Sequence, residues 1–170
     1  NTLLNSTGAQ AASTIVVSTP SATQISASRR AVPGTTPVPA RWALITRDAW
    51  VGYPETRRRV LAAVQESNVS NPVVVTGDWH ASFVLDVAEE PGGPTVMPEF
   101  LVSSISTVLF PTDYREHNSH VRYFVAEHGY AVVSVTPREL RCDFRYVADV
   151  WDPDTGIART DSWVLAAGSR

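Results

Sequence analysis

The feature that most constrains this chain is an apolar run that ends in a polar turn. Residues 72–76 include three consecutive valines, which favour a strand buried on both faces. Gly77 ends the run, and Asp78 and His80 follow at the carboxyl end of the strand, where open α/β sheets place their ligands. Residues i and i+2 of an extended backbone point the same way, so Asp78 and His80 are predicted to converge while Trp79 points into the fold.

A carboxylate beside an imidazole is part of a site for a metal ion, although two ligands do not hold a catalytic metal. The same spacing is also typical of a plain turn, in which Asp78 caps backbone amides and His80 is an ordinary polar residue. The local pattern leaves both interpretations open.

Composition narrows the class of protein. Of the 170 residues, 44% are hydrophobic and 18% are charged, which indicates a globular chain. The formal net charge of −3 provides no basic surface for a nucleic-acid partner. No apolar stretch is long enough for a membrane span, and no signal-peptide pattern is visible. Because the chain begins at Asn1, we expect a fragment or a processed product, and we expect the single Cys142 to be a small core residue.

The first 40 residues differ from the rest. They are rich in Ser, Thr, Ala and Pro, and no charged residue precedes Arg29. We therefore predict a low-complexity arm or linker over residues 1–40, in which residues 14–17 could form a short strand. Residues 41–170 are predicted to be the folded part.

Periodicity predicts one helix followed by several strands. A helix is expected over residues 54–66, with Arg57, Arg58 and Arg59 mainly on its solvated face. Strands are expected over residues 81–87, 98–105 and 162–166, and a hairpin over 129–135 and 140–150. The alternation in the second hairpin strand predicts one buried face, formed by Leu140, Cys142, Phe144, Tyr146 and Ala148. It also predicts that Asp143 pairs with Arg141 or Arg145.

His117 and His120 stand three residues apart. If they shared a helix face they could chelate a metal ion. The alternative is that Asn118 or Ser119 caps a short helix over residues 121–128, which Gly129 closes.

Several sequence blocks in a fixed order resemble the C-terminal part of the PhoD-like alkaline phosphatases, a branch of the calcineurin-like metallophosphatases. The blocks are DAWVGY at 48–53, RRR at 57–59, TGDWHAS at 76–82, PEFLVSS at 98–104 with Ser106, NSHVRYF at 118–124, GY at 129–130 and VTP at 135–137. Residues 1–40 do not resemble any part of that family. The resemblance therefore identifies residues 41–170 with the C-terminal portion of such a domain.

The resemblance implies an α/β (α+β) fold, namely an incomplete part of a metallophosphatase β-sandwich with flanking helices. It implies metal-dependent hydrolysis of phosphate esters with calcium and iron, and a secreted or cell-envelope location. Asp78 and His80 match the family's late metal-binding motif, so both are expected to bind metal and His80 to be catalytic. Asp48, Tyr53, Asn118 and His120 match blocks near the family's site and are expected to be site neighbours.

Two departures from the family bear on function. Val51 stands where most relatives have an acidic residue, and residues 1–47 contain none of the upstream ligand motifs. The missing N-terminal part of the same domain is therefore a possible partner, and we expect little phosphatase activity from the chain alone.

Three hypotheses about the function of the chain follow, each from a different class of protein. The chain could contribute Asp78 and His80 to a metal-dependent phosphatase. It could be a degenerate relative that serves as a binding or structural module. It could also be an unrelated small α/β hydrolase with a site formed by Asp113, His117 and His120.

Overall fold

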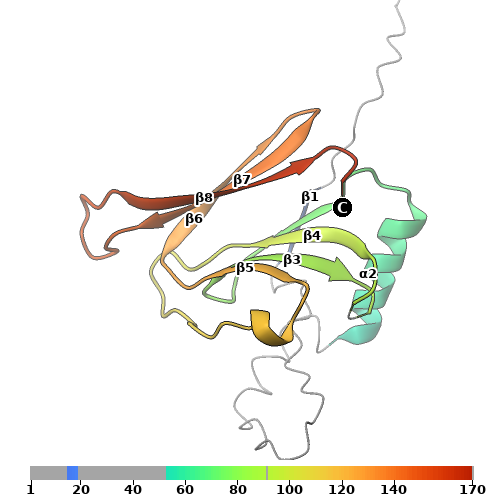
Figure 1. The fold of residues 1–170 in the computed structure, drawn as a ribbon, viewed down its shortest axis with the longest axis horizontal. Helices are drawn as coiled ribbons and strands as arrows, with labels where there is room; N and C mark the ends of the chain where they lie inside the picture. Colours follow the sequence, from blue (N-terminus) through green and yellow to red (C-terminus); the bar gives the residue numbers. More distant parts are fainter. Residues whose placement is uncertain (1–14, 19–52, 91, 170) are drawn as a thin grey trace, which may run out of the picture.

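Two β-sheets that face one another dominate the computed structural model, which describes residues 15–18, 53–90 and 92–169 (Figure 1). The five-stranded sheet has the order β1-β2-β4-β3-β5 and consists of β1 (Ile15–Ser18), β2 (Val73–Thr76), β3 (Ser82–Ala88), β4 (Thr95–Leu101) and β5 (Val121–Val125). The three-stranded sheet is the meander β6 (Gly129–Val135), β7 (Glu139–Val147) and β8 (Ile157–Ala166). Helix α2 (Pro54–Glu66) and the short 3-10 helix η2 (Arg115–His117) are the described helices. This arrangement confirms the predicted α/β (α+β) sandwich.

The strand directions bring several loops to one edge of the five-stranded sheet. Strands β1, β2 and β4 are parallel, so their carboxyl ends meet at that edge. Strand β3 starts there, because it runs antiparallel to β4, and β5 ends there, because Val125 pairs with Ser82. We call this the site edge, and its described loops are residues 77–81, 102–110 and 126–128.

The main core lies between the two sheets. One layer comes from the five-stranded sheet and includes Val73, Val84 and Phe100, and the other comes from β7. The β7 side chains that fill this core are Leu140, Cys142, Phe144 and Tyr146. These are four of the five residues that the alternating pattern predicts to be buried; the fifth, Ala148, is exposed and follows the last residue of β7. Asp143 pairs with Arg141 at 2.9 Å, as expected.

The opposite face of the five-stranded sheet is also covered. Leu61 of α2 packs with Val74, Val87 and Met97, and Figure 1 shows the helix beside one end of β3 and β4. A second apolar cluster, centred on Phe83, is packed against by Trp79 and Tyr114. Strands β2, β3 and β4 are thus buried on both faces, as the run of valines predicts for β2.

Arg57 departs from the expected solvated position. Its side chain is 7% exposed. It donates hydrogen bonds to the carbonyl oxygens of Ala88, the last residue of β3, and Glu89, the latter at 3.0 Å. Arg58 remains exposed, as predicted, and pairs with Glu55. The prediction failed for Arg57 because these carbonyl groups need donors, and a long side chain on α2 can reach them.

Other elements match the sequence prediction to different degrees. Helix α2 has the predicted bounds, and the short strand expected near residues 14–17 is present as β1. The predicted helix over residues 121–128 is wrong, because that segment forms β5 and pairs with β3. Val121, Tyr123, Phe124 and Val125 are β-branched or aromatic, which suits a strand on a half-buried surface. None of the described helices is long and apolar enough to span a membrane.

A chain of polar side chains bridges the two sheets. The hydroxyl group of Tyr123, on β5, lies 2.9 Å from that of Tyr146, on β7, and donates a hydrogen bond to Asp161 Oδ2 on β8 at 2.6 Å. Arg159 also pairs with Asp161 at 3.1 Å. Burial and the hydrogen bond to Asp161 raise the pKa of Tyr123, so its phenol keeps the proton that it donates.

Removal of the Tyr123 hydroxyl group tests this bridge. Tyr123→Phe is expected to lower the free energy of unfolding by about 1 to 2 kcal/mol, because it leaves Tyr146 and Asp161 without a shared partner. Tyr130→Phe removes a hydroxyl group from a more exposed tyrosine on β6 and serves as the control. Urea unfolding followed by circular dichroism measures both, and equal stabilities would contradict the bridging role.

The contrast between neighbouring arginines gives a second test. Arg57→Met is expected to destabilise the chain by about 2 kcal/mol, because two part-buried carbonyl groups lose a charged donor. Arg58→Met removes a solvent-exposed ion pair and is expected to leave the urea midpoint almost unchanged. A larger loss for Arg58→Met than for Arg57→Met would show that the packing of α2 is misassigned.

Candidate metal centre

The backbone after β2 is not extended. Asp78 has φ 76° and His80 has φ 58°, so both lie in the left-handed region. The i, i+2 rule for strands therefore does not apply to this pair, and that part of the sequence argument is wrong. Asp and His are among the residues that tolerate this conformation best, yet each still costs about 1 kcal/mol. Strained backbone of this kind tends to gather at functional sites.

His80 is held on two sides by the loop that follows β4. Its Nδ1 lies 2.6 Å from the carbonyl oxygen of Val108, and its ring stacks on Phe110 with centroids 4.9 Å apart and planes 6° apart. The backbone N–H of Phe110 also donates to the carbonyl oxygen of His80 at 3.3 Å. Because a carbonyl group can only accept, Nδ1 carries the proton of the neutral ring, and the lone pair is left on Nε2.

This is the arrangement that metal-binding histidines use, since the second ring nitrogen is usually anchored by a carbonyl or carboxylate group. Asp78 is exposed on the same loop and adds a carboxylate. These donors fit a hard or borderline metal ion. Within residues 15–18, 53–90 and 92–169 there is no group of three or more His, Cys, Asp or Glu side chains that could hold a metal.

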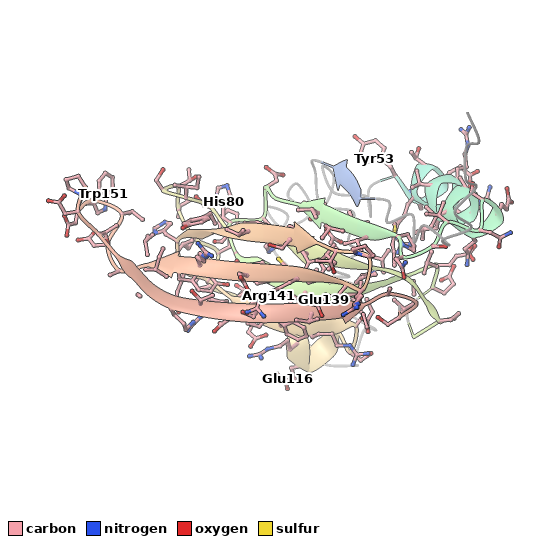
Figure 2. The ribbon with its side chains drawn as sticks, turned by 90° about the horizontal axis from the view of Figure 1, so that it is seen from above. Tyr53, His80, Glu116, Glu139, Arg141 and Trp151 are labelled. Atoms are coloured by element: carbon pink, nitrogen blue, oxygen red, sulfur yellow. The ribbon has the colours of Figure 1, made fainter. Side chains whose placement is uncertain are left out.

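The predicted neighbours of the site lie in different places. Tyr53 precedes the first residue of α2 and is 57% exposed, and Figure 2 shows it well apart from His80. Asp48 lies outside the described residues. The structure therefore does not bring Tyr53 to His80, and it gives no placement for Asp48.

Asn118 and His120 lie at the far end of β3 from the site edge. The backbone N–H of Asp86, near the carboxyl end of β3, donates to the carbonyl oxygen of His120 at 2.9 Å. Asn118 donates to the carbonyl oxygen of Tyr114 at 2.8 Å, and the Tyr114 ring meets Trp79 edge-on with centroids 6.0 Å apart. The described contacts thus connect Asn118 to the site edge through two aromatic rings and not directly.

The contacts and burial of two other candidate reactive groups, Asp113 and Cys142, give each of them a structural role. Asp113 is exposed and binds Arg115 through both carboxylate oxygens, and these hydrogen bonds hold the pKa of its carboxyl group below the usual range. Burial raises the pKa of the Cys142 thiol to about 12, so it stays protonated in the core, as predicted. Neither group is arranged as a nucleophile.

Sequence reasoning missed the groups that support the site. The partner of His80 is a backbone carbonyl, which no residue type at position 108 would reveal. Glu99 is fully buried and accepts a hydrogen bond from Thr76 Oγ1, directly before the Gly77 turn. A lone acidic residue among the apolar residues of β4 was the available signal for this buried pair.

Comparison with known proteins places these features in a family. A family model described as PhoD-like phosphatase matches residues 7–144. Alkaline phosphatase D of Bacillus subtilis (strain 168) is 30% identical over 131 residues, which cover 71% of this chain and 22% of that protein. A solved structure of PhoD gives a TM-score of 0.63 at 30% identity and covers 71% of this chain and 25% of its own. This chain thus spans a quarter or less of the length of each relative.

The family match also corrects the reading of the first 40 residues. It starts at residue 7, so the expectation that no part of residues 1–40 resembles the family is wrong for residues 7–40. The family match extends over more than half of the chain and agrees with the fold and with the blocks that contain Asp78 and His80. The chain therefore belongs to the PhoD-like phosphatase family.

Proposed function

We propose that this chain is part of a metal-dependent phosphatase that hydrolyses phosphate esters, and that it contributes Asp78 and His80 as metal ligands. The observation that carries the proposal is the anchoring of His80 Nδ1 on Val108, which presents Nε2 as a donor at the site edge. The family membership and the name of the B. subtilis relative, an alkaline phosphatase, support the phosphate-ester substrate. Membership also rejects the hypothesis of an unrelated hydrolase built on Asp113, His117 and His120.

The two side chains divide the work by their chemistry. When bound, the metal ion neutralises phosphate charge and activates the nucleophile. Asp78 supplies a negative hard oxygen donor, and His80 supplies a neutral nitrogen donor whose direction is fixed by Val108 and Phe110. The remaining ligands come from outside the described residues, and calcium and iron are the metals that the family resemblance implies. A degenerate binding module is the competing function, and it predicts a folded chain without metal affinity at this loop.

The Asp78 carboxylate can be removed without changing the backbone preference. Asn also tolerates the left-handed region, so Asp78→Asn is expected to keep the fold while it loses the anionic oxygen. The assay uses the assembled enzyme, meaning this chain together with the part of the domain that supplies the remaining ligands. Its turnover of p-nitrophenyl phosphate should fall by more than roughly 10- to 100-fold, which is the typical cost of losing a group that only supports a metal ligand. Asp154→Asn, in the exposed β7–β8 turn, is the matched control, and equal turnover in both variants would refute the assignment of Asp78.

The two histidines give a parallel comparison. His80→Asn is expected to lower the metal content of the assembled enzyme far more than His117→Asn, because Asn accepts the positive φ but lacks the Nε2 donor. Metal content after dialysis, measured by mass spectrometry, checks this. Equal losses in the two variants would mean that the family motif has been placed on the wrong histidine, and unchanged metal content in both would favour the binding module.

A further inference from the structure

The loop that touches His80 is itself fixed at its other end. Ser104 Oγ accepts hydrogen bonds from the backbone N–H groups of Ser106 (3.2 Å) and Thr107 (2.7 Å), which closes a tight turn. His128 Nε2 then lies 2.8 Å from the carbonyl oxygen of Thr107. The next carbonyl group along the chain, that of Val108, is the one that meets His80.

The exposure of the side chains in this loop indicates which of its groups hold His80. The Val108 side chain is 66% exposed, so its backbone carbonyl, and not its apolar group, serves the site. Phe110 is the opposite case. Its ring is half-buried and lies parallel to the imidazole of His80, which restricts rotation of that imidazole about its side-chain torsions. Loss of this ring would free the imidazole to leave the Val108 carbonyl and to exchange tautomers.

We propose that Phe110 is a positioning residue for His80. Its stacked ring holds the imidazole against the Val108 carbonyl group, so that the proton stays on Nδ1 and Nε2 stays available to a metal ion. The statement about metal binding rests on the proposed function, whereas the statement about tautomer and ring orientation concerns the chain without metal. The two parts can therefore fail separately.

The test uses nitrogen-15 NMR of the imidazole in the full 170-residue chain. In the unaltered chain, His80 is expected to show the proton on Nδ1. Phe110→Leu should give averaged signals of both tautomers, whereas Phe110→Tyr, which keeps the ring, should restore the pattern of the unaltered chain. A backbone amide spectrum of each variant confirms that it is folded.

Two controls separate positioning from general packing. Val108→Ala removes an exposed side chain but keeps the carbonyl group, so His80 should not change. Phe124→Leu removes a half-buried ring that packs on the ring of Phe83, with centroids 5.1 Å apart. This change should also leave the His80 tautomer unchanged. If Phe124→Leu disturbed His80 as much as Phe110→Leu does, the positioning role would be disproved.

Titration with Mn²⁺, followed by paramagnetic broadening of the His80 signals, adds the metal readout. Phe110→Leu should weaken this binding by about 10-fold relative to the unaltered chain. An unchanged tautomer and unchanged Mn²⁺ affinity in Phe110→Leu would overturn the proposal. Absence of Mn²⁺ broadening in the unaltered chain would instead show that Asp78 and His80 do not bind the ion without the remaining ligands, and the tautomer comparison would then decide the role of Phe110.

Discussion

Burial of β2, β3 and β4 on both faces is the constraint on which the rest of this structure depends. Their inner side chains meet the three-stranded sheet, and their outer side chains meet α2 and the residues around Trp79 and Tyr114. Polar groups on such strands must find partners inside the fold, as Thr76 and Glu99 do. Exposed polar chemistry is therefore displaced to the strand ends, which is where Asp78 and His80 stand.

The local backbone explains why these residue types suit the site edge. Chain reversal between β2 and β3 places two residues in the left-handed region, where Asp and His are tolerated and β-branched residues are not. Under the proposed function, the same two residues carry the donors for a metal ion. Backbone preference and ligand chemistry thus select the same side chains. The free-energy cost of the left-handed backbone is offset by the packing of β2 and β3, which are buried on both faces.

The sequence was most informative where the pattern is local. Helix α2 and the β6–β7 hairpin followed from periodicity, because each element is set by its own apolar residues. Prediction failed where contacts with residues far away in the sequence determine the structure. Local cap signals around Asn118 and Gly129 favoured a helix, but pairing with β3 made residues 121–125 a strand. The anchoring of His80 was also hidden, because its partner is a backbone carbonyl 28 residues away.

The crossing from one sheet to the other links the core to the site edge. His128 binds the Thr107 carbonyl group, and the next residue, Gly129, donates its N–H to the Ser104 carbonyl group at 3.2 Å. A Cβ atom at position 129 would collide with the backbone of Arg145, so only glycine allows β6 to approach β7 this closely. The hydrogen bonds from His128 and Gly129, which position the loop that contacts His80, therefore depend on how the two sheets are joined. This dependence gives the second sheet, which carries neither Asp78 nor His80, a physical part in holding the site.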